Sequence, residues 1–470
     1  MFKSIELQKK YEARLSRYIT AMHGGTPDRI PIRFFFQEAA ARFAGYTSQQ
    51  VACNYNLAFD ATREMAISMD SDAVMLNAIW SNYGVGKAAG WRYLNVPGVD
   101  VSGDSVLQYS EPEREEDMLM FEDEYDEFSS DPTAFLYGKW LSRYANRIKA
   151  PGGAVDAEHN MTIAAGAMAY ANYMNAFGPA AYKLKYEAGV VSANSGMIKA
   201  PLDIFSDKLR GYLSTAIDTL ERPEQVLKAC EALMPHLLAN ALGGADPDGL
   251  VPVTLWAHRG CTPFFSKETF EKIFWPTLKP LLEEIIAAGH QVLFYGEGNW
   301  EAHYDSLLEL PAGGIIYHLD KGDPILAAKK LKGKFALSGG LNYDVLSRGT
   351  TDDVRLYMKK LLSEIAADGG YILDCSALML NDIKPENVRT AVDYILDHGV
   401  YSSGHEGFTP LKVNPLITKN VGIRPPNTCI SWERESSNYR NLSGDLALVK
   451  RSWQAVDSAA YNYIWTTLLW

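Results

Sequence analysis

The chain has 470 residues, 47% hydrophobic and 22% charged, a composition typical of a globular protein with a large core. Its net charge of −12 and its lack of a basic cluster argue against nucleic acid as a partner, because phosphate groups attract Lys and Arg. No apolar run is long enough to cross a bilayer, so we expect no membrane insertion. Five scattered cysteines predict no disulfide framework and favour a cytoplasmic location.

Short apolar runs that are typical of strands alternate with amphipathic stretches that are typical of helices. Strands that are apolar nearly throughout indicate a parallel sheet with both faces covered. Their repetition predicts an α/β protein with a (β/α)₈ TIM barrel, and no GxGxxG motif follows a strand as a Rossmann sheet would require. In chain order, the predicted strands are 29–36, 71–80, 251–258, 291–297, 313–320, 334–341 and 369–375.

Two segments have the character of additions to this barrel. Residues 111–128 contain ten acidic residues out of eighteen, which predicts a solvated surface insertion or, alternatively, a docking surface for a basic partner. Residues 411–470 begin as a proline-punctuated loop and end in a helical stretch rich in aromatic residues. We therefore divide the chain into a barrel at 1–410 and a C-terminal extension at 411–470. The extension would pack on the barrel or on a partner subunit, which allows a homodimer.

The side chains available for chemistry in a barrel lie at the carboxyl ends of its strands. Glu297 and His318 end consecutive predicted strands, and neighbouring strands lie only about 5 Å apart. With Cys375 at the end of a later strand, they could hold a catalytic Zn²⁺. Each also has a simpler interpretation, in which Glu297 is a general acid or binds substrate, His318 forms hydrogen bonds, and Cys375 belongs to the core.

Several stretches resemble the uroporphyrinogen decarboxylase superfamily, and within it the corrinoid-dependent methyltransferase branch. They are "DRIPIRFFFQEAA", "DIFSDKLRGYLSTAIDTLERPEQV", "LSGGLNYDVLSRGTTDDV" and "GGYILDCSALMLNDIKPENVRTAVDYI". Thiol-alkylating members carry His-x-Cys-Gly where this chain has Tyr295-Gly296-Glu297-Gly298. A harder Glu/His site suits the polarisation of an oxygen atom. The twenty residues between Glu297 and His318 resemble the final spacing of the zinc set in methyltransferase I components of vanillate-type anaerobic O-demethylases.

The resemblance implies an enzyme that transfers a methyl group from a phenyl methyl ether, such as vanillate or guaiacol, to the Co(I) corrinoid of a separate protein. A separate corrinoid protein is expected because the chain lacks an Asp-x-His-x-x-Gly signature. The alternatives are a decarboxylase of the same superfamily, in which Arg210 would help to bind an acid, and a non-catalytic binding protein. The expected catalytic residues are Tyr295, Glu297 and His258, the substrate-binding residues are Gln37, Trp80, Trp256, Phe264 and Asn342, and the zinc ligands are Glu297, His318 and Cys375.

Overall fold

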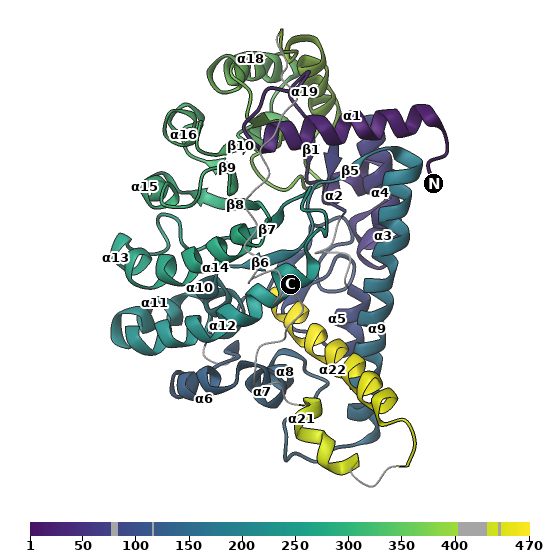
Figure 1. Ribbon diagram of the computed structural model, residues 1–470, viewed down its shortest axis with the longest axis vertical. Coiled ribbons are helices and arrows are strands. Elements are labelled where there is room, and N and C mark those ends of the chain that lie inside the picture. Colours follow the sequence, from purple (N-terminus) through teal and green to yellow (C-terminus); the bar gives the residue numbers. More distant parts are fainter. Residues whose placement is uncertain (77–82, 115–116, 403–429, 440–442) are drawn as a thin grey trace.

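A ring of short strands surrounded by helices forms the centre of the molecule (Figure 1). The computed structural model describes residues 1–76, 83–114, 117–402, 430–439 and 443–470, so Trp80 lies outside the described residues. Six strands form one parallel ladder in the order β11-β10-β9-β8-β7-β6, and three form a second in the order β1-β2-β5. The strands are β1 (Arg33–Phe34), β2 (Ala73–Val74), β3 (Leu94–Asn95), β4 (Gln108–Tyr109), β5 (Val191–Ser192), β6 (Met197–Lys199), β7 (Val253–Ala257), β8 (Val292–Asn299), β9 (Ile315–Lys321), β10 (Ala336–Gly339) and β11 (Tyr371–Ile372).

The two ladders meet edge to edge and give the TIM-barrel type of fold that the sequence predicts. Ile32, just before β1, forms a parallel bridge with Leu373, just after β11. On the other side only residues 193–196 separate β5 from β6, so the chain passes directly from one ladder to the next. The ladders are shorter than the predicted apolar runs. At β1 one reason is Pro31, which has no N–H to donate and only accepts a hydrogen bond from Leu373.

Helices cover the outside of this ring, and many begin with a recognisable signal in the sequence. Proline occupies the first turn of α16 and α19, where a backbone N–H would have no acceptor within the helix, so its absence costs no hydrogen bond. A capping box of Thr350 and Asp353 starts α18. The longer helices are α1 (Ile5–Met22), α4 (Tyr55–Ser68), α9 (Ala157–Tyr182), α11 (Tyr212–Glu221), α12 (Pro223–Gly244), α14 (Trp275–Ala287), α16 (Pro324–Leu331), α18 (Thr351–Leu361), α19 (Pro385–His398) and α22 (Leu446–Leu469). The shorter ones are α2 (Glu38–Phe43), α3 (Ser48–Ala52), α5 (Tyr83–Ala89), α6 (Tyr125–Ser130), α7 (Pro132–Phe135), α8 (Leu141–Tyr144), α10 (Pro201–Ile204), α13 (Lys267–Thr269), α15 (Tyr304–Leu307), α17 (Tyr343–Ser347) and α21 (Trp432–Glu435).

The two ends of the barrel differ in what covers them. Helix α1 packs across the amino ends of the strands, where Gln291, just before β8, donates a hydrogen bond to the carbonyl of Met22. Helix α1 does not cover the carboxyl ends of the strands, and this is the end at which barrels of this type bind their ligands. No helix within the described ranges is both long and apolar enough to span a bilayer.

The described part of the C-terminal extension packs on the rest of the chain. The indole Nε1 of Trp465 in α22 donates to Thr133, and its ring stacks on His236 with a centroid separation of 4.2 Å. Tyr461 forms a hydrogen bond of 2.8 Å with the same histidine. In Figure 1, α22 runs inward from the lower edge, and the end of the chain lies near β6. The aromatic residues of this helix therefore hold its last turn close to the carboxyl end of the barrel.

Candidate active site

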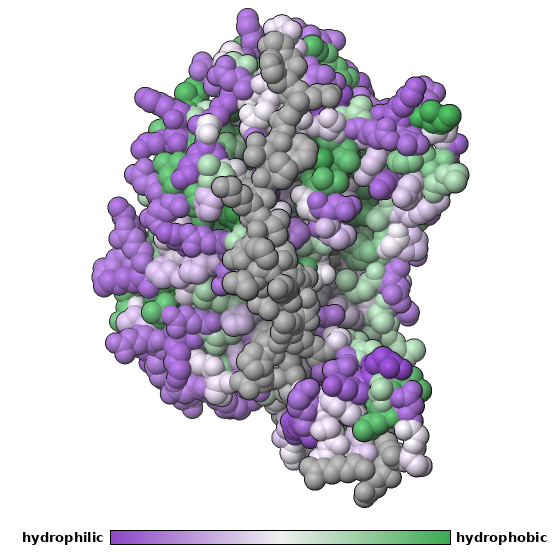
Figure 2. Space-filling model, in the orientation of Figure 1, coloured by the Kyte–Doolittle hydropathy of each residue, from purple (hydrophilic) through white to green (hydrophobic). Residues whose placement is uncertain are grey.

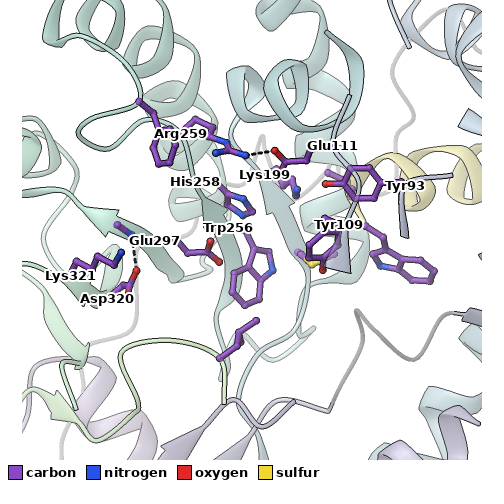
Figure 3. Close-up of a pocket in the computed structure, with 16 residues that line it drawn as sticks. Tyr93, Tyr109, Glu111, Lys199, Trp256, His258, Arg259, Glu297, Asp320 and Lys321 are labelled. Carbon is purple, nitrogen blue, oxygen red and sulfur yellow. Dashed lines mark hydrogen bonds and ion pairs between the residues drawn. The ribbon is translucent and has the colours of Figure 1, made fainter. Parts of the chain in front are cut away.

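A cavity of about 360 Å³ opens at the carboxyl ends of four consecutive ladder strands, β6 to β9. Figure 3 shows Glu297 on one side of it and Tyr93 and Tyr109 on the other, with His258 and Trp256 between them. Its volume is within the range of small-molecule sites in proteins. The lining residues are Tyr93, Tyr109, Glu111, Met197, Lys199, Trp256, His258, Arg259, Phe264, Glu297, Gly298, Asp320, Lys321, Leu378, Leu469 and Trp470.

Glu297 reaches this cavity from the end of β8, where the ladder with β9 becomes irregular between Gly296 and Asn299. Burial, and next the nearby carboxylate of Asp320, raise the pKa of Glu297 to about 7, although Lys199 opposes them. Within the described residues, the Glu297 carboxyl group has no hydrogen bond or ion pair. It is therefore a carboxylic acid that is partly protonated near neutral pH and free to bind a ligand.

Asp207, a buried aspartate, contacts three basic side chains on one side of the cavity. Asp207 lies 2.9 Å from the ammonium group of Lys199, 3.4 Å from Nδ1 of His258 and 3.4 Å from Nε of Arg259. Burial alone would raise the pKa of Asp207, but Lys199, His258 and Arg259 outweigh it and hold the pKa below its usual range. The carboxylate is therefore ionised and fixes three side chains that face the cavity or its rim.

His258 is a neutral hydrogen-bonding group in this arrangement. Burial, and next the charge of Lys199, lower the pKa of His258 to about 3, although Asp207 opposes them. Because Nδ1 faces the Asp207 carboxylate, the proton belongs on Nδ1 and the lone pair on Nε2. Nε2 has no partner among the described residues, so it is available to accept a hydrogen bond from a ligand.

Aromatic side chains from distant parts of the chain form much of the remaining wall. Tyr109 comes from the β3–β4 hairpin, Trp256 from β7, and Trp470 follows α22. The Trp470 ring packs edge to face on Tyr173 of α9, with centroids 5.2 Å apart. A cavity with aromatic walls and a few polar groups suits a flat, largely apolar ligand that carries polar substituents.

Four of the residues predicted for the site line this cavity, namely Glu297, His258, Trp256 and Phe264. Tyr295 does not, because it lies in the barrel core beneath the cavity and stacks on Phe35 and His318. Its predicted role as a proton donor to substrate is not supported by this position. Tyr295 and Glu297 are two positions apart on β8 and so share one face of the strand, but Glu297 lies nearer to its carboxyl end, where the cavity opens.

His318 is also in the barrel core, where both of its ring nitrogens already have partners. Nδ1 lies 3.1 Å from a guanidinium nitrogen of Arg33, which can only donate, so Nδ1 accepts. Nε2 lies 3.2 Å from the carbonyl oxygen of Ser376 and therefore carries the proton. Burial, and next the charge of Arg33, lower the pKa of His318 well below its usual value. The prediction of His318 as a zinc ligand is corrected, because neither nitrogen is free to bind an ion.

The predicted zinc set is not assembled in this fold. Cys375 is fully buried in the hydrophobic core, and burial raises the pKa of its thiol above its usual value. Among the residues that the structure describes, no three His, Cys, Asp or Glu side chains are grouped so that they could hold a metal ion. Glu297, His318 and Cys375 therefore do not fit a shared zinc ion, and no catalytic step is assigned to one.

This geometry predicts the response of the protein to removal of metal. Incubation with dipicolinate is expected to leave the melting temperature unchanged, since Glu297, His318 and Cys375 do not depend on an ion for their positions. The His318→Asn variant is expected to melt at a lower temperature, because Arg33 and the Ser376 carbonyl lose a buried partner. Near-stoichiometric zinc in the wild type that disappears in both Glu297→Ala and His318→Ala would contradict this assignment.

Three other residues singled out in the sequence lie outside the cavity lining. Gln37 is buried before α2 and does not line the cavity. Asn342 caps α17 by accepting a hydrogen bond from the N–H of Val345. Arg210, which motivated the decarboxylase alternative, is buried and bound to Asp218 at 2.7 Å. Gln37 and Asn342 therefore do not line this cavity, and Arg210 is already paired and does not face it.

The sequence predictions missed Lys199, Asp207, Tyr93, Tyr109 and Trp470. Lys199 ends β6, and the apolar run "GVVSANSGMIKAP" around it is a strand signal followed by a helix-starting proline. Asp207 belongs to a π-helical turn, Phe205–Leu209, that continues α10. The two tyrosines and Trp470 are near the site only because separate segments pack there, and no local pattern marks them.

The comparison with known proteins agrees with this fold. The model of the family described as uroporphyrinogen decarboxylase (URO-D) matches residues 178–398, which carry β5 to β11 and the cavity residues from Met197 to Leu378. The structure of a methyltransferase from Methanosarcina mazei is similar with a TM-score of 0.56 and 13% sequence identity. The similarity covers 82% of this chain and 98% of that one, and it shows a common fold. No curated protein matches the sequence.

Proposed function

We propose that this protein transfers a methyl group from a phenyl methyl ether to a corrinoid carried by a separate protein. The URO-D domain and the fold shared with a methyltransferase support a methyltransferase-type activity. The observation that carries the proposal is Glu297, an unpaired carboxyl group with a pKa of about 7 in a cavity with aromatic walls. Such a group is what cleavage of an aryl ether needs, because phenolate leaves poorly unless its oxygen is protonated.

The aromatic wall would hold the ring of the substrate. Tyr109, Trp256 and Trp470 offer apolar faces, while Lys199 and His258 supply polar groups. The Nε2 atom of neutral His258 would accept a hydrogen bond from a phenolic hydroxyl next to the ether. Lys199, held by Asp207, would pair with a negatively charged substituent such as a carboxylate. Vanillate-like and guaiacol-like molecules meet these requirements.

Glu297 would act at the moment when the bond between the methyl carbon and the ether oxygen breaks. Its proton passes to the ether oxygen, so that a neutral phenol leaves and the carboxylate remains on the enzyme. The Co(I) centre of a corrinoid supplies the electron pair that takes the methyl group. The cavity is far too small for a corrin ring, so the acceptor must reach the methyl group from the open side. After release of the phenol, Glu297 regains a proton from solvent.

A methyl-transfer assay tests this function directly. The purified enzyme is incubated with a methyl acceptor, either chemically reduced cob(I)alamin or a reduced corrinoid protein. The methyl donor is guaiacol or vanillate with a deuterated methoxy group, and the demethylated products serve as controls. We expect the methyl ether to be converted to its demethylated phenol. For each molecule of this product released, one deuterated methyl group is expected on the corrinoid. The absence of phenol release from a panel of methoxyaromatics with either acceptor would refute the proposal.

A further inference from the structure

Helix α11 presents its hydrophobic residues to solvent instead of to the protein. Leu213, Ile217 and Leu220 follow the spacing of one helix face and are 62%, 45% and 76% exposed. A helix on the surface of a globular protein normally buries such a stripe. Hydrophobic atoms are visible among hydrophilic ones in Figure 2 at the lower left, where Figure 1 places α11. An apolar stripe that faces outward indicates a surface for contact with another molecule.

The opposite face of α11 explains this orientation. Thr215, Asp218 and Thr219 are buried there. The carboxylate of Asp218 accepts hydrogen bonds from Tyr125 at 2.8 Å and from Arg210 at 2.7 Å, and it also pairs with Arg222. These buried charged groups would be destabilised if the helix turned over, because each would lose its partners. The polar network therefore fixes the apolar stripe on the outside.

The stripe begins at the rim of the cavity. Tyr212, the first residue of α11, donates a hydrogen bond of 2.6 Å to the carbonyl of Phe264 and packs edge to face on that ring. The guanidinium group of Arg259 lies 5.5 Å from the centre of the Tyr212 ring. Phe264 and Arg259 both line the cavity. A molecule that binds Leu213, Ile217 and Leu220 would therefore lie beside the candidate active site.

Acidic side chains flank the same helix. Glu122 pairs with Arg222 at 3.0 Å, and Met118 contacts Ser214, so residues 117–128 of the acidic segment pack alongside α11. Part of that segment is structural, because Glu124 binds Arg143 and Lys139. Five further acids are exposed, and Glu122, Asp126 and Glu127 among them pair with Arg222, Lys228 and Lys139. Glu113 and Asp123 have no ion pair among the described residues and leave the surroundings of the stripe with a negative charge.

We propose that Leu213, Ile217 and Leu220, with their acidic border, form the docking surface for the protein that carries the methyl-accepting corrinoid. This proposal rests on the proposed function, which requires a protein partner to approach the open side of the cavity. The partner would contribute apolar side chains to the centre of the contact and Lys or Arg side chains to its border. A second copy of this chain fits less well, because a two-fold contact through α11 would bring like-charged acidic borders together.

The test compares two methyl acceptors, free cob(I)alamin and purified corrinoid proteins, with guaiacol as donor. In the double variant Ile217→Glu/Leu220→Glu, the KM for a corrinoid protein is expected to rise about 10–100-fold, as for loss of a central apolar contact. The rate with free cob(I)alamin is expected to stay unchanged, since it needs no protein contact. Leu356→Glu, at a 71% exposed leucine of α18, is the matched control and is expected to change neither rate.

Each outcome bears on one of the two proposals. An unchanged KM for corrinoid protein in the double variant would overturn the proposal of a docking surface. A wild type that methylates free cob(I)alamin but no corrinoid protein of the panel would overturn it as well. A dimer that dissociates in the double variant, with methyl transfer unaltered, would assign the stripe to a second copy and also overturn it. A wild type that demethylates no ether with either acceptor would refute the proposed function instead. Charge reversal at Glu113 and Asp123 is expected to raise the same KM, more strongly at low salt.

Discussion

Replacement of Glu297 by Gln is expected to lower the rate of ether cleavage about 10²–10⁴-fold, the usual contribution of a general acid. Glutamine keeps the size and hydrogen-bonding capacity of the side chain but has no proton that it can give up. Single-turnover release of the phenol measures the effect, and the affinity for the phenol product shows whether the cavity still binds. Glu283→Gln, at a partly exposed position on α14 outside the cavity, is the control. A rate within a few-fold of the wild type would exclude Glu297 as the acid.

The same residue predicts the pH dependence of the reaction. Burial, and next the charge of Asp320, raise the pKa of Glu297 to about 7, and only the protonated form can donate. The rate is therefore expected to be highest below pH 7 and to fall as the pH rises through that value. Asp320→Asn removes a neighbouring negative charge, so the fall in rate should move to lower pH. A profile unchanged in this variant would contradict the electrostatic role of Asp320.

The second large effect concerns Asp207. The Asp207→Asn variant is expected to lose about 3–5 kcal/mol of unfolding free energy, as when one partner of a buried ion pair is removed. Lys199 and Arg259 would keep their positive charges beside a neutral amide, and His258 would lose the group that orients its ring. Denaturation in urea at pH 7 measures the loss, and Asp123→Asn, at an exposed position, is the control. Equal stability of wild type and variant would contradict the central role of Asp207.

The lowered pKa of Asp207 also predicts how its contribution to stability depends on pH. The pKa of Asp207 lies below that of an aspartate in the unfolded chain, about 3.9. Its ionised form therefore stabilises the fold fully above about pH 4, and this contribution is lost as the pH falls through the lower native pKa. The difference in stability between wild type and Asp207→Asn should thus be constant near neutrality and shrink in acid. A difference that grows in acid would be inconsistent with this assignment.

Much of the fold was predictable because it depends on patterns that are local in the chain. Apolar runs separated by amphipathic stretches are sufficient to indicate a parallel sheet covered by helices. The rule that chemistry occurs at the carboxyl ends of barrel strands then selected Glu297, His258 and Trp256, which do line the cavity. These predictions hold because a strand end and its loop are adjacent in sequence.

The three predicted zinc ligands are not grouped among the described residues, for a reason that no local pattern contains. Whether His318 faces an ion or the barrel interior depends on Arg33, which comes from β1 at the far end of the chain. Arg33 also binds Asp374 and Ser338, so the interior of the barrel contains a buried polar network that occupies the histidine. His318 is in register with Tyr295, two positions before the level of Glu297, and spacing alone cannot distinguish a residue at the tip from one at this deeper level.

The sequence by itself determined the class of fold, the strand ends and the carboxylate at Glu297, because each follows from residues that are neighbours in the chain. Only the tertiary structure decided what surrounds that carboxylate. Tyr109 comes from a hairpin and Trp470 follows the last helix, and packing brings both to one cavity, while Asp207 from a helical turn holds Lys199 at its wall. The burial of Glu297, and next the charges of Asp320 and Lys199, set its pKa, and electrostatic effects of this kind depend on distance in space, not on separation in sequence.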